Sequence, residues 1–187
     1  MKELVDLESL LSALSRSWDR ETSADSANWL PNNPAWGQCA VTSLVVQDFL
    51  GGGLVRLDLS QHPNPKVAAM RSHYFNQTVD GTYLDVSAGQ FSDDVDSFVA
   101  IKNDPAKLIL KKRGYCLGNE QTRHRYVELR LRVAQRLSGD NQLFGDKIYR
   151  RCLTLALGSD CQKGKYGCVV TFDNHVVVET FNKILEP

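Results

Sequence analysis

The chain has 187 residues and a balanced formal charge, with 22 Lys and Arg against 22 Asp and Glu. Its length suits one ordinary domain or two small ones, and its 42% hydrophobic and 24% charged residues exclude a wholly disordered chain. Residues 1–100 carry 6 basic and 13 acidic side chains, whereas residues 101–187 carry 16 and 9. The two halves therefore have net charges of −7 and +7, and we expect them in part to attract each other.

The sequence shows no sign of export or of a membrane span. No apolar run approaches the roughly 18–20 residues that a membrane-spanning helix needs. The N-terminus, residues 1–6, is acidic and amphipathic, unlike a secretory signal. Five cysteines, none in a C-x-x-C pair, suit reduced thiols. We therefore expect a cytoplasmic protein without disulfides that makes no membrane contact.

Apolar spacing predicts two helices in the first third of the chain. Leucines recur at helical spacing over residues 3–18. Residues 39–50 are almost all apolar and run into three glycines, where a helix would stop. Residues 23–34, between the two, are rich in turn formers and predict an irregular loop. The helix over residues 39–50 is expected to be mostly buried.

β-Prone runs follow these helices. Residues 54–59 predict a strand, and residues 73–79 and 82–86 flank Asp80-Gly81, which is typical of a β-hairpin. Residues 92–121 contain only short apolar islands, which predict no clear element.

The remainder of the chain predicts a helix, a linker and a second helix-and-hairpin group. The predicted segments are a helix over 122–137, a linker over 138–141, a helix over 143–157, and strands over 166–172 and 175–181. Together these elements predict an α+β protein with domains at residues 1–138 and 139–187.

Cys39 is the residue with the clearest chemical interest. It begins a predicted helix, where unpaired backbone N–H groups and the positive end of the helix dipole stabilise a thiolate. A thiol catalyst also needs a base held by a third group. His73 and Asp85 lie on the two arms of the predicted hairpin, although the register that would align them is open. The alternative is that Cys39 is simply a small buried side chain.

Two segments carry a family resemblance. The run NPAWGQCAVTSLVVQDFLGG at residues 33–52, with the HYFN, DG, LDV and QF motifs of residues 73–91, resembles the small bacterial YunG-like proteins over about residues 5–91. The order Cys, His, Asp is also similar to the core of transglutaminase-like and papain-like thiol enzymes. The resemblance implies a papain/transglutaminase-like N-terminal domain in which Cys39 is the nucleophile, His73 the general base and Asp85 the residue that orients the imidazole.

Two positions depart from the thiol-enzyme pattern. Ala40 stands where transglutaminase-like enzymes often place Trp, and Asn33 stands where papain-like enzymes place an oxyanion glutamine. Gln38 or the Cys39 backbone N–H is then the candidate oxyanion donor. The substrate, a small molecule or a peptide, stays open.

The C-terminal part has a resemblance of its own. The runs YRRCLTLA, SDCQK and YGCVV within residues 149–170 resemble the first helix and hairpin of the cytidine deaminase fold. The H-x-E and P-C-x-x-C motifs that bind zinc in that family are absent from the sequence. The resemblance thus implies a partial deaminase fold without the zinc chemistry. Core packing explains Cys161, Cys168 and His175 better than metal binding, and we expect no metal or organic cofactor.

Basic residues are concentrated in one segment. Residues 107–151 carry 12 basic and 4 acidic side chains. Arg125, Arg132 and Arg136 on the predicted helix are candidates for binding nucleic acid phosphates. The alternative is a solvated helix face paired with the acidic N-terminal half. No helix-turn-helix, zinc-finger or RNA-binding signature favours nucleic acid.

The expected function is that of a thiol-dependent hydrolase or acyl/amide transferase that uses Cys39, His73 and Asp85. Two alternatives stay open: a non-catalytic binding or regulatory protein, and a nucleotide- or nucleic-acid-directed protein related to the deaminases.

Overall fold

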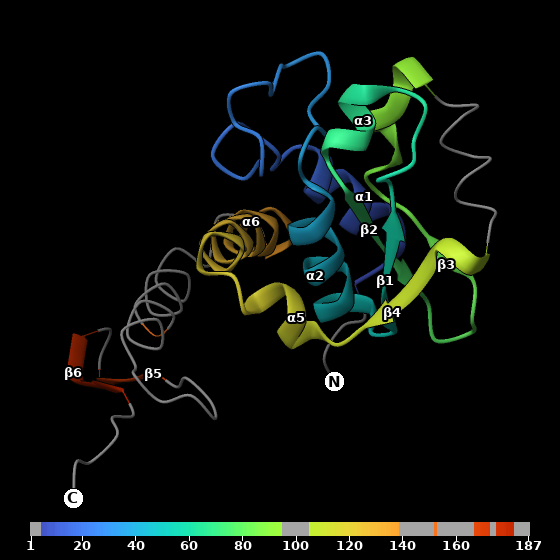
Figure 1. Cartoon of the computed structure of the whole chain (residues 1–187). Coiled ribbons are helices and arrows are strands. Elements are labelled where there is room, and N and C mark those ends of the chain that lie inside the picture. The colour runs from blue at the N-terminus through green and yellow to red at the C-terminus, as the bar shows by residue number, and fades with distance from the viewer. Residues whose placement is uncertain (1–4, 95–104, 139–151, 153–166, 173–174, 182–187) are drawn as a thin grey trace, which may run out of the picture. The chain divides into compact units, whose positions relative to one another are not determined.

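The computed structural model describes residues 5–94, 105–138, 152, 167–172 and 175–181 (Figure 1). The chain divides into two compact units, Met1–Val133 and Ala134–Pro187. The first unit combines helices with an antiparallel sheet, and the second contains a β-hairpin. The α+β class predicted from the sequence is therefore confirmed.

A four-stranded antiparallel sheet lies at the centre of the first unit, in the order β3-β2-β1-β4. In the pairing of β1 with β2, Val55 lies opposite Phe75 and Leu57 lies opposite His73. The apolar members of these pairs join Leu59, Val67 and Phe91 in one core cluster. The strands are β1 (Gly53–Asp58), β2 (Ser72–Gln77), β3 (Tyr83–Leu84) and β4 (Leu108–Lys111).

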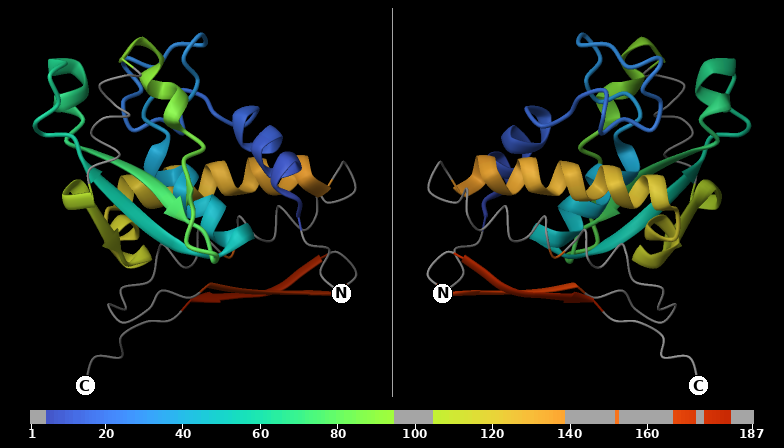
Figure 2. Two further views of the ribbon diagram at one scale, coloured as in Figure 1. Left: turned by 90° about the vertical axis from the view of Figure 1, so that its right-hand side faces the viewer. Right: turned by 90° about the vertical axis from the view of Figure 1, so that its left-hand side faces the viewer.

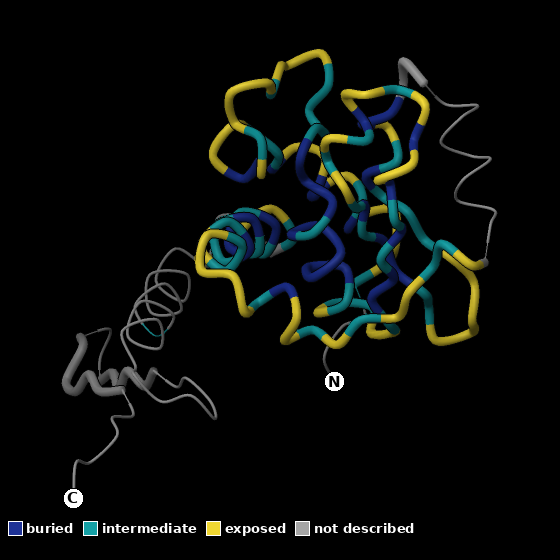
Figure 3. The backbone as a smooth tube through the Cα atoms, viewed as in Figure 1, coloured by how far each residue is buried: buried dark blue, intermediate teal, exposed yellow. Residues whose placement is uncertain are grey.

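Helix α2 (Cys39–Leu50) contacts both β1 and β2 and is largely buried, as the dark tube of Figure 3 shows. On β2, the Asn76 amide donates to the carbonyl of Ser43 at 3.0 Å and so ties the strand to this helix. The helix ends where Gly51 and Gly52 adopt φ angles of 74° and 79°. Glycine reaches this left-handed region without the steric cost of a Cβ atom.

Shorter elements and most of one long helix complete the first unit; residues 134–138 of that helix are assigned to the second unit. At α1 the Asp6 carboxylate accepts a hydrogen bond from the backbone N–H of Ser9 at 2.8 Å, which is an N-cap, and the helix buries Leu10 and Leu14. The remaining elements are α1 (Leu7–Ser15), α3 (Pro65–Ala69), α5 (Arg113–Leu117), α6 (Glu120–Ser138), and the 3₁₀ segments η1 (Ala88–Asp94) and η2 (Pro105–Lys107).

Strands β5 (Gly167–Phe172) and β6 (His175–Phe181) of the second unit pair antiparallel and form the ribbon drawn in red in Figure 2. This hairpin confirms the two strands predicted at the C-terminal end. The predicted helix over residues 143–157 lies outside the described residues except for Cys152, and of the linker predicted over 138–141 only Ser138 is described.

Most predicted elements of the first unit are confirmed. Helix α2 has the predicted bounds, whereas α1 is shorter than the predicted helix and α6 is slightly longer. The predicted hairpin closes through a hydrogen bond from the Thr78 N–H to the Thr82 carbonyl at 2.8 Å, but β3 has only two residues. Residues 105–117 form η2, β4 and α5, which the short apolar islands did not predict.

In the part of the chain that the structure describes, no helix has both the length and the apolar character needed to cross a bilayer.

Gly37 sets the path of the chain into α2. Its φ angle is 72°, and a Cβ atom there would lie 2.4 Å from the Ser23 Oγ and 3.0 Å from the Ala24 nitrogen. We predict that Gly37→Ala lowers the free energy of unfolding by more than about 1–2 kcal/mol, because it adds a collision to the strain of the left-handed region.

Urea unfolding of the variant measures this loss. Gly114→Ala is the matched control, because a Cβ atom at Gly114 in α5 meets no atom within 4 Å. If the two variants had equal free energies of unfolding, the close approach of Gly37 to Ser23 and Ala24 would be contradicted.

Candidate active site

Cys39 is the first residue of α2 and keeps 7% of its surface exposed. The first hydrogen bond of the helix runs from the Thr42 N–H to the Gln38 carbonyl at 2.9 Å, and no side chain caps this end. The first backbone N–H groups of a helix have no partner within the helix. The Cys39 sulfur therefore stands where such groups favour a negative charge.

The register of the hairpin brings His73 and Asp85 together. Asn76 pairs with Leu84, so Asp85, the next residue, falls opposite Phe75. Residues two apart on a strand share a face, so His73 and Asp85 lie on the same side of the hairpin. The His73 Nε2 lies 3.0 Å and 2.9 Å from the two Asp85 carboxylate oxygens. The structure therefore settles the register that the sequence left open.

The His73 ring is shut off from water. It has no exposed surface, and the Asp85 side chain is 3% exposed. The Phe91 ring packs edge-on against the imidazole with centroids 5.1 Å apart, and the Phe75 ring stacks at 6.0 Å. Burial alone opposes a charge on the ring. Hydrogen bonds and opposite charge from Asp85 and from Cys39 outweigh this effect and raise the pKa of His73 to about 9.

Gln90 also contacts the imidazole. Its amide nitrogen lies 2.9 Å from the His73 Nδ1 and 3.2 Å from the Ser87 carbonyl, to which it donates. Gln90 is 2% exposed, and its backbone carbonyl accepts a hydrogen bond from the Asn33 amide at 3.0 Å. Gln90 belongs to the QF motif at residues 90–91, but nothing in the sequence indicated that it contacts His73.

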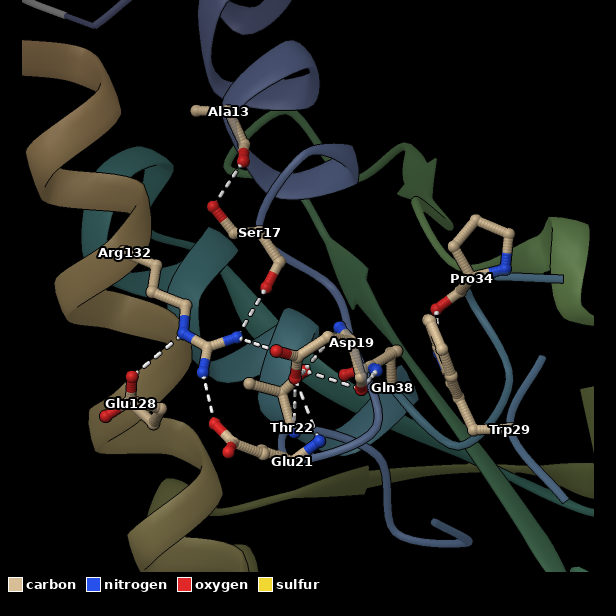
Figure 4. Close-up of polar contacts among 10 residues, drawn as sticks. All are labelled: Ala13, Ser17, Asp19, Glu21, Thr22, Trp29, Pro34, Gln38, Glu128 and Arg132. Carbon is tan, nitrogen blue, oxygen red and sulfur yellow. Dashed lines mark hydrogen bonds and ion pairs between the residues drawn. The ribbon is translucent and has the colours of Figure 1, made fainter. Parts of the chain in front are cut away.

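The structure places Gln38 beside Cys39 but engages its side chain elsewhere. Gln38 is fully buried, and its amide nitrogen donates to the Asp19 carbonyl at 2.8 Å (Figure 4). The Gln38 side-chain amide thus hydrogen-bonds to the segment before α2. Of the two oxyanion candidates, the Cys39 backbone N–H is the one without such a bond to the Asp19 carbonyl.

The three arginines singled out in the sequence differ in their surroundings. Arg132 contacts Asp19, Glu21 and Glu128, the last two at 2.6 Å and 2.8 Å (Figure 4). This network pairs α6 with the acidic N-terminal segment, as the charge distribution led us to expect. Arg136, further along α6, is exposed.

Arg125 is half-buried and interacts electrostatically with Cys39. Burial lowers the pKa of Arg125, and the charge of Cys39 acts in the opposite direction. Its Nη2 donates to the Thr122 hydroxyl at 3.2 Å, and its Nε has no hydrogen-bond partner among the described residues.

The described residues contain no group of three or more His, Cys, Asp or Glu side chains arranged to hold a metal ion. Cys168 pairs with Thr180 and His175 with Phe172, so the register separates these two residues along the hairpin. Cys161 lies outside the described residues.

Comparison with known protein families assigns the chain to one of them. The family model described as YunG protein matches residues 6–138, which is most of the sequence and includes the whole candidate site. The chain belongs to the YunG family. The match confirms the resemblance noted at residues 33–52 and 73–91 and extends it through α6.

One curated relative is the uncharacterized protein YunG of Bacillus subtilis (strain 168), which is 31% identical over 78 residues. The matched region is 42% of this chain and 56% of the relative, so the chain spans little more than half of that protein's length. No solved structure matches the chain.

The buried His73–Asp85 pair gives the fold a specific dependence on pH. The pKa of His73 rises from 6.5 to about 9 on folding, so its contribution to stability is complete below pH 6.5 and is lost as the pH rises through about 9. We predict that the free energy of unfolding falls by at most about 3–4 kcal/mol across this window, because each pKa unit corresponds to about 1.4 kcal/mol.

Urea unfolding at a series of pH values tests this dependence. Asp85→Asn should flatten the curve between pH 6.5 and 9, because the amide accepts the ring N–H but carries no charge. If the free energy of unfolding of Asp85→Asn depended on pH as steeply as that of the unsubstituted protein, the His73–Asp85 pair would not be the source of the pH dependence.

Proposed function

We propose that the protein is a thiol-dependent hydrolase or acyl/amide transferase in which Cys39 is the nucleophile, His73 the general base and Asp85 the residue that orients the imidazole. The observation that carries the proposal is that the His73 Nε2 lies within hydrogen-bonding distance of both Asp85 carboxylate oxygens. Cys39 also acts on this ring through a hydrogen bond that raises its pKa. Three residues from distant segments, α2, β2 and the chain after β3, supply the groups of a catalytic triad.

The order of contacts suits proton transfer from the thiol. Because Nε2 faces both oxygens of Asp85, Nδ1 is the ring nitrogen left for Cys39. In the reacting pair the proton of the Cys39 thiol resides on Nδ1, which the raised pKa of His73 favours, and the thiolate attacks the carbonyl carbon of the substrate. The tetrahedral intermediate then collapses, and the leaving group departs with the proton from the imidazolium. Water or an amine, deprotonated by His73, cleaves the resulting thioester and restores the thiol.

The start of α2 supplies the charge stabilisation that this chemistry needs. The negative charge on the carbonyl oxygen of the intermediate develops beside the helix N-terminus, and the Cys39 backbone N–H is the donor that we assign to it. Cys39 is buried with 7% of its surface exposed, and His73 has no exposed surface.

This arrangement corresponds to the active-site order of papain-like and transglutaminase-like enzymes, and we extend that likeness to the N-terminal domain only as part of the proposal. The substrate class is left at a compound with an activated or amide carbonyl. The ion pairs of Arg132 favour this function over a nucleic-acid-binding one, because they occupy that guanidinium with carboxylates of the same chain.

Reactivity of Cys39 tests the proposal. The protein is incubated at pH 7 with p-nitrophenyl acetate, and mass spectrometry locates the acetyl group. We expect it on Cys39, with at least a tenfold slower transfer in His73→Gln, because glutamine can donate to Asp85 but cannot take the thiol proton.

His124→Gln is the matched control, because His124 lies on α6 with 61% of its side chain exposed, and it should leave the rate unchanged. Acetylation of Cys39 that proceeds equally fast without the His73 imidazole would contradict the proposed function.

A further inference from the structure

Gln90 and Cys39 compete for one nitrogen of His73. Both Asp85 oxygens contact Nε2, so the ring proton that they attract sits on that atom. In the neutral ring Nδ1 is then an acceptor, and the Gln90 amide nitrogen lies 2.9 Å from it. The same lone pair must accept the Cys39 proton if the thiol is to ionise within the pair.

The orientation of the Gln90 amide is fixed by a second contact. Its nitrogen also donates to the Ser87 carbonyl at 3.2 Å, whereas its oxygen is buried with no hydrogen-bond partner among the described residues. Turning the amide over would place an oxygen against the Ser87 carbonyl and would lose that hydrogen bond. Gln90 therefore presents a donor, and not an acceptor, to the imidazole.

The backbone around Gln90 is anchored as well. The Asn33 amide, from the segment before α2, donates to the Gln90 carbonyl at 3.0 Å, and the neighbouring Phe91 ring packs against His73. The backbone at Gln90 is thus anchored, and the residue is 2% exposed.

We propose that Gln90 restrains the proposed nucleophile: its amide N–H competes with the proton of Cys39 for the His73 Nδ1 and so opposes formation of the thiolate. This inference rests on the proposed function, since it concerns the same proton transfer. Asp85 favours the protonated ring and Gln90 favours the neutral one, so the balance between thiol and thiolate depends on these two opposed contacts. Gln90 is a positioning residue that acts through His73.

Other titratable groups bear on this balance as well: Arg125 of α6 and Cys116 of α5 interact electrostatically with Cys39. The titratable groups that act on His73 are Asp85, from the chain after β3, and Cys39, from α2. The cross-strand neighbour from β1 is Leu57, and η1 contributes Gln90 and Phe91, which carry no charge. Gln90→Met therefore removes one hydrogen bond to the ring and adds no charge beside it.

The test measures the rate at which iodoacetamide alkylates Cys39 between pH 5.5 and 9. Gln90→Met removes the donor while keeping a side chain of similar length. We expect about fivefold faster alkylation at pH 6, the change in equilibrium that one hydrogen bond of about 1 kcal/mol produces. Gln90→Glu, whose carboxylate accepts from a protonated Nδ1, should accelerate the reaction further. Gln77→Met, on the same strand as His73, is the matched control and should leave the rate unchanged.

The shape of the pH profile separates the outcomes. A loosened fold would expose an ordinary thiol, whose reaction gains speed only towards pH 8.5, so a gain at pH 6 requires the paired imidazole. An unchanged or slower rate at pH 6 in both Gln90 variants, with Cys39 still dependent on His73, would overturn the restraint and leave the proposed function standing. A Cys39 that reacts as a free thiol and ignores His73→Gln would overturn both.

Discussion

The buried contact between His73 and Asp85 is the constraint on which the candidate site depends. Two groups that are almost inaccessible to water face each other at 2.9–3.0 Å through both carboxylate oxygens. Removing charges from water costs several kcal/mol per ion, and only good geometry offsets that cost. Two apolar side chains of similar volume would fill this space without that desolvation cost. The paired imidazole and carboxylate in the core are therefore the feature on which the proposed chemistry rests.

The fold holds this pair beside Cys39 through contacts between distant segments. Asn76 ties β2 to the middle of α2, three residues along the strand from His73. Gln38 ties the residue before Cys39 to the Asp19 carbonyl, and Arg132 of α6 holds the Asp19 carboxylate. The start of α2 is thus fixed from the N-terminal segment and from α6 at once. Such a network limits the movement of the thiol relative to the ring.

The uneven charge of the sequence also has a structural use. The Asp48 carboxylate, near the end of α2, forms ion pairs with Arg113 at 2.8 Å and Arg130 at 2.9 Å. It also accepts a hydrogen bond from the Tyr126 hydroxyl at 2.6 Å. Together with the Arg132 network, these contacts join basic side chains of α5 and α6 to acidic residues that precede β1. At least three of the twelve basic side chains of residues 107–151 are therefore paired with carboxylates within the first unit, so a basic count alone is weak support for a nucleic-acid partner.

The sequence predicted the site where its signals were local. The glycines at 51–53 marked the end of α2, and Asp80-Gly81 marked the hairpin that brings His73 to Asp85. The pairing of Asn76 with Leu84, on which the alignment of His73 and Asp85 depends, is a property of the folded hairpin. Gln90 was missed because its role arises only when η1 packs on β2, and β4 was missed because four residues are too few to show alternation.

The most direct measurement of the central claim is the NMR titration of the His73 imidazole in the unsubstituted protein and in Cys39→Ala. If the thiol and the ring share a proton, loss of the sulfur removes a partner that favours the protonated ring, and the pKa of His73 falls below about 9. An imidazole that titrates at the same pH with and without Cys39 would show that the two groups do not interact, and the catalytic account would be wrong.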